Sequence, residues 1–202
     1  MSTLDQITRD LNWRESELGI LKLLLNRPDN SDRQREVLLR AAWALLYAHY
    51  EGYSKFCLEL YFDELAKRTP NCKGLPVTTR AFALRKKLKE IRCKPELEFL
   101  ASIEEFETSA LNSLPNFPEV DTQSNLWPNV LRDLLVCADL NPEIVSSYEA
   151  QLKTLVSRRN EIAHGQKNFI SEVAYYITFD EAVRGIMYDL AFAIDERLAQ
   201  TH

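Results

Sequence analysis

Apolar residues recur at helical spacing in the first third of the chain. Residues 4–26 carry them on one face, which predicts an amphipathic helix. Residues 27–31 break this pattern, and Ser31 is a suitable N-cap for the next helix. Residues 32–68 then contain no breaking signal, and residues 37–53 are apolar nearly all round. We therefore expect a second, long helix that is buried at the centre of a bundle.

The remaining elements are also expected to be helical or irregular. Residues 69–76 have prolines near both ends and predict a loop, whereas residues 114–128 hold three prolines and predict a long surface connection. Residues 129–140 predict a short amphipathic helix. Asn141, Pro142 and Glu143 then form a start signal for a helix that runs to His164.

A last helix is expected to begin at Thr178 or Asp180 and to end near Ala199. No pattern of paired strands and no internal repeat is present in the sequence. The 202 residues are enough for one domain with a substantial core. We predict an all-α bundle of five to seven helices that forms a single domain over residues 1–202.

Charge divides two neighbouring segments sharply. Residues 77–94 contain seven basic residues against Glu90, whereas residues 95–131 contain no lysine or arginine and seven acidic residues. This asymmetry indicates either two opposed faces or a basic arm that folds against an acidic one. The basic residues between Arg80 and Lys94 are suited to guiding RNA phosphates, but a solvated helix face is at least as good an explanation.

The bulk composition excludes several classes of protein. The net charge of −5 argues against sequence-independent binding of nucleic acid over the whole surface, although it allows a local basic site. The four cysteines form no CxxC pair and the three histidines are far apart, so we expect no metal site, no cofactor and no disulfide framework. The sequence shows neither a signal peptide nor an apolar run long enough to span a membrane. The expectation is a soluble protein of the cytoplasm.

The most informative short stretch is Arg158-Arg159-Asn160-Glu161-Ile162-Ala163-His164-Gly165. Helix-forming residues that run into His-Gly predict a helix that ends here, with Gly165 as the left-handed cap. One interpretation is structural: His164 satisfies the last carbonyls of the helix and the arginines are solvated. The other is catalytic, because histidine transfers protons near neutral pH and arginine binds phosphate through its fork of donors.

Metal-independent cleavage of RNA would use these groups in a specific way. One group takes the proton of the 2′-hydroxyl, another protonates the leaving 5′-oxygen, and a cation stabilises the crowded phosphate. Asn160 and His164 lie four residues apart and hence on one helical face, whereas Arg159 lies about 140° away from His164 on an ideal helix. One helix supplies a single histidine, so the motif predicts a homodimer in which a two-fold axis presents the same patch twice.

The stretch from Arg159 to Gly165 resembles the R-x4-6-H signature of HEPN-domain ribonucleases, in the form where a polar residue follows the arginine. A second block, Tyr47-Ala48-His49-Tyr50-Glu51-Gly52-Tyr53-Ser54-Lys55, resembles the more specific YAHxEGxxK core helix of one prokaryotic branch. That branch groups the RiboL-PSP and MAE-type HEPN domains. The two blocks and the helices between them cover most of the chain.

The resemblance implies a HEPN-type helical bundle, a homodimer with a composite cleft, and metal-independent endoribonuclease activity. Such proteins act as toxins or phage-defence effectors on RNA and can have a cognate antitoxin or inhibitor. Carried over by position, Arg159 and His164 take the catalytic places and Asn160 the polar place beside them. Arg158 also satisfies the looser spacing, and it is a further candidate for RNA binding; Arg159 is preferred because Asn160 follows it directly.

Two residues of the second block have open roles. His49 and Glu51 form either a buried structural pair, which we favour, or a second layer of residues that orients the side chains lining the cleft. A different function is also open for the whole chain. A catalytically silent HEPN module that binds a partner protein or a nucleotide would keep the fold, cleave no RNA and retain its binding without Arg159.

Overall fold

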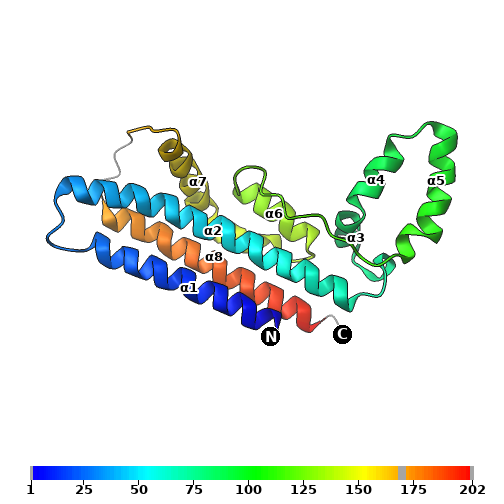
Figure 1. The fold of residues 1–202 in the computed structure, drawn as a ribbon, viewed down its shortest axis with the longest axis horizontal. Coiled ribbons are helices and arrows are strands. Elements are labelled where there is room, and N and C mark those ends of the chain that lie inside the picture. The colour runs from blue at the N-terminus through cyan, green and yellow to red at the C-terminus, as the bar shows by residue number, and fades with distance from the viewer. Residues whose placement is uncertain (1, 168–171, 201–202) are drawn as a thin grey trace.

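Three long helices form the body of the molecule. The computed structural model describes residues 2–167 and 172–200 (Figure 1). Helices α1 (Thr3–Leu25), α2 (Asp32–Arg68) and α8 (Val173–Ala199) lie side by side along the long axis of the molecule. As the sequence predicts, α2 begins at an N-cap Ser31, whose hydroxyl accepts a hydrogen bond from the Gln34 backbone N–H. Trp43, Leu46 and Tyr50 of α2 are completely buried, so α2 is the central helix of the core.

Gly52 of α2 lies against the side chain of Arg14 of α1. A Cβ atom at this position would lie 3.1 Å from Nη1 of Arg14, which reaches across from α1. The missing side chain therefore makes room for a largely buried guanidinium, which pairs at 2.6 Å with Asp10 one turn earlier on its own helix. This contact explains why α2 tolerates a glycine that costs about 1 kcal/mol relative to alanine in a helix interior.

A second layer covers one side of the long helices. Helix α7 (Glu149–Ala163) packs against α2 and α8, and α6 (Pro128–Cys137) lies beside it. The helix expected to start at Pro142 is instead divided, because η3 (Pro142–Tyr148) is a 3₁₀-helix and α-helical geometry begins only at Glu149. The last helix also begins earlier than expected. It starts at Val173, because Tyr176 and Phe179 pack as helical residues around Trp43.

The charged segments form an arm that extends away from the long helices (Figure 1). The arm contains α4 (Arg85–Arg92) and α5 (Glu96–Thr108) and is joined to the body through α3 (Val77–Ala83). The short 3₁₀ turns η1 (Cys72–Gly74) and η2 (Ala110–Asn112) lie at its base. Lys87 of α4 pairs with Glu105 of α5 at 3.2 Å, so the basic helix folds against the acidic one.

The predicted all-α class is confirmed. The described residues form eight α-helices and no β-strand. The count exceeds the expected five to seven because the basic segment is divided into α3 and α4 at Leu84, and because α5 is a separate helix. None of the helices in the described ranges combines the length and apolar character that a bilayer span requires.

Candidate functional site

The C-terminus of α7 ends in a well-formed glycine cap. Gly165 has φ +73°, and its N–H donates to the carbonyl of Ile162 at 3.0 Å. The N–H of Gln166 donates to the carbonyl of Glu161 at 2.9 Å, which completes the Schellman motif. The carbonyl of Gln166 in turn accepts a hydrogen bond from Arg40 of α2 at 2.8 Å. The predicted left-handed cap is therefore confirmed, and α2 fixes the direction in which the chain leaves the helix.

Arg159 is held in one position by three neighbours from different parts of the chain. Its Nη1 donates to Oδ1 of Asn125 at 2.9 Å and to Oδ1 of Asn160 at 3.0 Å. Its guanidinium carbon lies 4.7 Å from the centre of the Tyr47 ring, a favourable distance for a cation–π contact. The guanidinium is thus half-buried between α7, α2 and the connection that precedes α6.

Tyr47 also anchors that connection. Its hydroxyl oxygen accepts a hydrogen bond from the backbone N–H of Leu126 at 2.9 Å. The connection turns sharply just before this point, where Gln123 and Ser124 both have positive φ angles of 54° and 69°. Burial, and to a smaller extent the nearby Glu51 carboxylate, raises the pKa of Tyr47 to about 12. The phenol therefore remains neutral at physiological pH and presents a stable face to Arg159.

His164 is exposed at the end of α7. Its imidazole makes no hydrogen bond or ion pair with the residues that the structure describes. Asn160 precedes it by one helical turn on the same side, whereas Arg159 lies about 140° around the helix and about 7.5 Å along its axis. Within one chain, the restrained arginine and the accessible histidine therefore occupy neighbouring but differently directed positions on the same helix end.

The two consecutive arginines have different partners. Arg158 donates to Glu161 at 3.0 Å on the surface of α7, where both side chains are about 30% exposed. Within the part of the chain that the structure describes, Arg159 pairs with no carboxylate, and its partners are two amide oxygens and an aromatic ring. Of the two arginines, Arg159 is therefore held by more contacts, and no carboxylate that the structure describes competes with an anion for it.

His49 faces away from α7, toward α1. Its Nε2 lies 2.9 Å from Oε2 of Glu17, and its Nδ1 lies 3.5 Å from Nη1 of Arg14. Burial lowers the pKa of His49, and the charge of Arg14 lowers it further, so the imidazole is neutral at pH 7. Glu51, by contrast, lies close enough to Tyr47 to influence its pKa. The structure thus separates His49 from Glu51 and brings only Glu51 near the Arg159 site.

Two residues of this site were not identified from the sequence as functional candidates. Tyr47 lies in the core-helix block, and its helical position four residues before Glu51 is the signal that could have identified it. Asn125 lies in a proline-rich connection 34 residues before Arg159, and no local pattern predicts their contact. The amide oxygen of Asn125 must face Arg159, because the amide nitrogen would oppose a donor to a donor.

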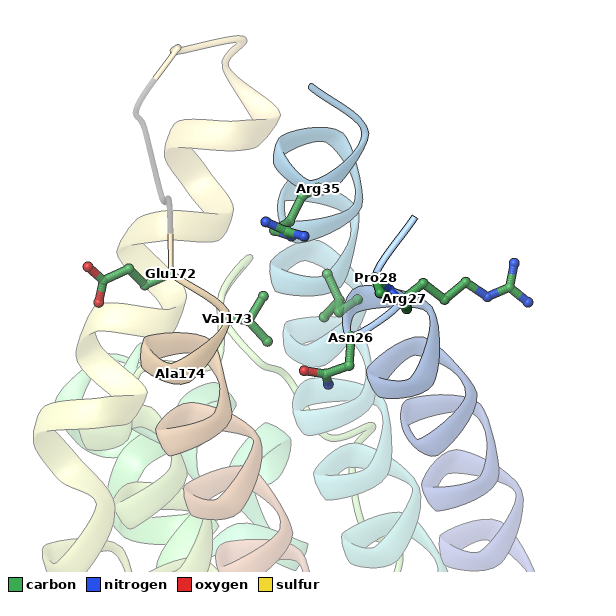
Figure 2. A pocket seen from close by; sticks show the side chains of 8 residues that line it. Asn26, Arg27, Pro28, Arg35, Glu172, Val173 and Ala174 are labelled. Carbon is green, nitrogen blue, oxygen red and sulfur yellow. The ribbon is translucent and has the colours of Figure 1, made fainter. Parts of the chain in front are cut away.

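Other polar features of the chain lie outside this cluster. Arg80 of the basic segment donates to the carbonyls of Lys73 and Leu75, so it braces the base of the arm. No cluster of three or more metal-ligating side chains occurs in the described ranges. A cavity of about 390 Å³ lies where the α1–α2 turn meets the start of α8 (Figure 2), and Arg35 and Asn26 lie at its edge without contact to Arg159.

One family matches nearly the whole chain. The model of the MAE_28990-like HEPN domains matches residues 3–202, a range that includes both the α2 block and the C-terminus of α7. No curated protein and no solved structure matches the chain. The helical architecture, the resemblance of the two sequence blocks and this match agree, and the chain belongs to the MAE_28990-like HEPN family.

Proposed function

We propose that this protein is a metal-independent endoribonuclease that cleaves RNA with Arg159 and His164, assisted by Asn160, in a cleft formed by two copies of the chain. The observation that carries this proposal is the contrast between the two residues on α7. Arg159 is restrained by Asn125, Asn160 and the Tyr47 ring. His164, one turn and a half further on, is accessible to solvent. Phosphodiester cleavage needs a fixed cation and groups that transfer protons, and this helix end supplies one of each kind.

The chemistry assigns a separate role to each group. An imidazole takes the proton of the 2′-hydroxyl, the 2′-oxygen bonds to phosphorus, and the bond from phosphorus to the 5′-oxygen breaks. An imidazolium protonates that leaving oxygen, so the products are a 2′,3′-cyclic phosphate and a 5′-hydroxyl. Arg159 donates to the phosphate oxygens while negative charge accumulates on them. Arg158, already paired with Glu161, contributes at most a secondary contact with RNA.

A second copy of the chain is needed because acid and base are two groups. Each chain places one histidine at this helix end, and His49 is buried against α1. A two-fold axis beside the C-terminus of α7 brings two His164 side chains to one cleft, since an isologous interface presents the same patch twice. His164 is exposed in a single chain and Asn160 is half-buried, which is compatible with such a contact.

The biological role that this chemistry supports is that of a toxin or phage-defence effector acting on cytoplasmic RNA. This part of the proposal rests on the resemblance to HEPN ribonucleases. Unrestricted cleavage of RNA harms the cell that produces it, so a cognate inhibitor is expected to control the enzyme. HEPN toxins that are paired with minimal nucleotidyltransferase antitoxins carry a tyrosine two residues after the histidine, which the partner modifies. Control of this kind is not expected here, because this position is Gln166.

The test is direct cleavage of RNA by the purified protein in the presence of EDTA. The wild-type protein should produce fragments with 2′,3′-cyclic phosphate ends, and His164→Ala should abolish cleavage. Circular dichroism and the molar mass should be the same for both proteins, since the imidazole makes no contact that the fold requires. Cleavage that persists in the His164→Ala protein, or a wild-type protein that cleaves no RNA, would contradict the assignment.

A further inference from the structure

Helix α5 carries an apolar surface that its own chain leaves open. Leu97 is 84% exposed, Leu100 62% and Ile103 38%, and Ser102 is the one buried residue of the helix. Figure 1 shows α5 on the outer side of the arm, away from the three long helices. Several large apolar side chains on one isolated helix are typical of a surface that binds another molecule.

The same helix is strongly acidic. It carries Glu96, Glu98, Glu104, Glu105 and Glu107, and it has no lysine or arginine. Its contact with α4 uses only a part of this charge, because Lys87 pairs with Glu105 at 3.2 Å. Lys94, just after α4, bonds to the Ser102 hydroxyl at 2.8 Å and not to a glutamate. The outward side of α5 therefore combines apolar side chains with unused negative charge.

A groove of matching character lies on the other side of α4. Its volume is about 540 Å³, and Phe82 and Leu88 contribute apolar surface to it. Three cations of α4, Arg85, Lys89 and Arg92, line it at intervals of four and three residues, which places them on one helical face. The guanidinium of Arg85 lies over the Phe82 ring at 4.8 Å, so this charge is held at the groove.

The groove and α5 are on opposite sides of α4. Lys87, which reaches α5, follows Arg85 by two residues and is therefore about 160° away around the helix. The α5 helix of the same chain is consequently tied to the side of α4 that faces away from the groove. An acidic and apolar helix that filled this groove would therefore have to come from another molecule.

We propose that α5 of one copy of this chain docks into the groove between α3, α4 and α6 of another copy. Leu97 and Leu100 would cover the apolar floor, while the glutamates of α5 would face Arg85, Lys89 and Arg92. This contact joins two different surfaces and is heterologous, unlike the two-fold contact at α7. RNA in the groove would satisfy its cations but would leave the apolar side of α5 and the apolar floor exposed, so a second copy accounts for more of the structure.

The experiment measures the molar mass of the full chain over a range of concentrations by sedimentation equilibrium. One variant, Leu97→Asp with Leu100→Asp, damages the docking helix, and another, Lys89→Glu with Arg92→Glu, damages the groove. Each variant alone should lose the largest assembly that the wild type forms. Leu23→Asp on α1 is the matched control, because Leu23 is 72% exposed and lies away from the arm. It should sediment as the wild type does.

Mixing the two damaged variants gives the decisive result. The intact groove of the first variant and the intact α5 of the second allow the arm contact to form between them, so the mixture should regain an assembly larger than the one that either variant forms alone. Unchanged masses in both variants measured alone, or a mixture with no assembly larger than either variant forms alone, would overturn the proposal. Loss of RNA binding by Lys89→Glu with Arg92→Glu at an unchanged mass would also overturn it, in favour of an RNA groove. His164→Ala should keep the arm contact, so this test is independent of the proposed catalysis.

Discussion

Removal of the Asn125 side chain tests whether the position of Arg159 matters for activity. In Asn125→Ala, the guanidinium loses the hydrogen bond of 2.9 Å to the amide oxygen but keeps Asn160 and the Tyr47 ring. A hydrogen bond to a charged group contributes about 1.5–3 kcal/mol, and partial exposure of this site places the value near the lower limit. If this hydrogen bond contributes its full strength in the transition state, its removal raises the activation free energy by about 1.4 kcal/mol and lowers the cleavage rate about tenfold.

The assay is single-turnover cleavage of a defined RNA, with the rate constant separated from the affinity for substrate. We expect the rate constant to fall while the affinity and the thermal midpoint change little, because Asn125 acts by positioning Arg159. Asn116→Ala is the matched control, since Asn116 is exposed in the same connection. An unchanged rate in Asn125→Ala, together with an inactive Arg159→Ala, would refute the positioning role and leave only the requirement for charge.

Three further predictions concern stability. Tyr47→Phe should cost about 1–3 kcal/mol in the free energy of unfolding, because the buried N–H of Leu126 loses its acceptor; urea denaturation measures this. Gly165→Ala should cost about 1 kcal/mol, or about 2–4 °C in the thermal midpoint, because φ is +73° although a Cβ meets no atom within 4 Å. The pKa of His49 in the folded protein lies below the ordinary 6.5. The native state is therefore favoured at pH values above 6.5, and this stabilisation is lost as the pH falls from 6.5 toward the lowered pKa. Between roughly pH 7.5 and pH 5, thermal melts should show a steeper loss of stability for the wild type than for His49→Gln; equal slopes would contradict the buried neutral state.

The sequence predicts the central helix of this fold well because several local signals agree. Ser31 caps α2, no proline interrupts it, and its middle is apolar on all sides, so propensity, capping and burial lead to the same result. The start of α8 is harder to predict. Thr178 resembles an N-cap residue, but its hydroxyl bonds to the carbonyl of Tyr175 inside the helix. The true start depends on the packing of Tyr176 against Trp43, which is a long-range contact.

The candidate site likewise has a part that the local sequence encodes and a part that depends on long-range contacts. Arg159 and His164 are recognisable because their motif lies on one helix end, where the glycine cap is also encoded locally. The contact of Arg159 with Asn125 depends on the path of a connection that turns through two left-handed residues, and no periodic pattern encodes it. The partners of His49 depend on how α1 packs on α2, which explains why the sequence suggested Glu51 rather than Glu17.

We propose that each cleft needs the His164 side chains of two chains. A fixed amount of wild-type protein is mixed with an equal amount of His164→Ala, the subunits are allowed to exchange, and RNA cleavage is measured with EDTA present. If both histidines are needed, about half of the wild-type chains enter inactive mixed dimers, and the total activity falls to about half. If each chain catalyses alone, the activity of the mixture stays at the level of the wild-type protein by itself, which would contradict a cleft shared by two chains.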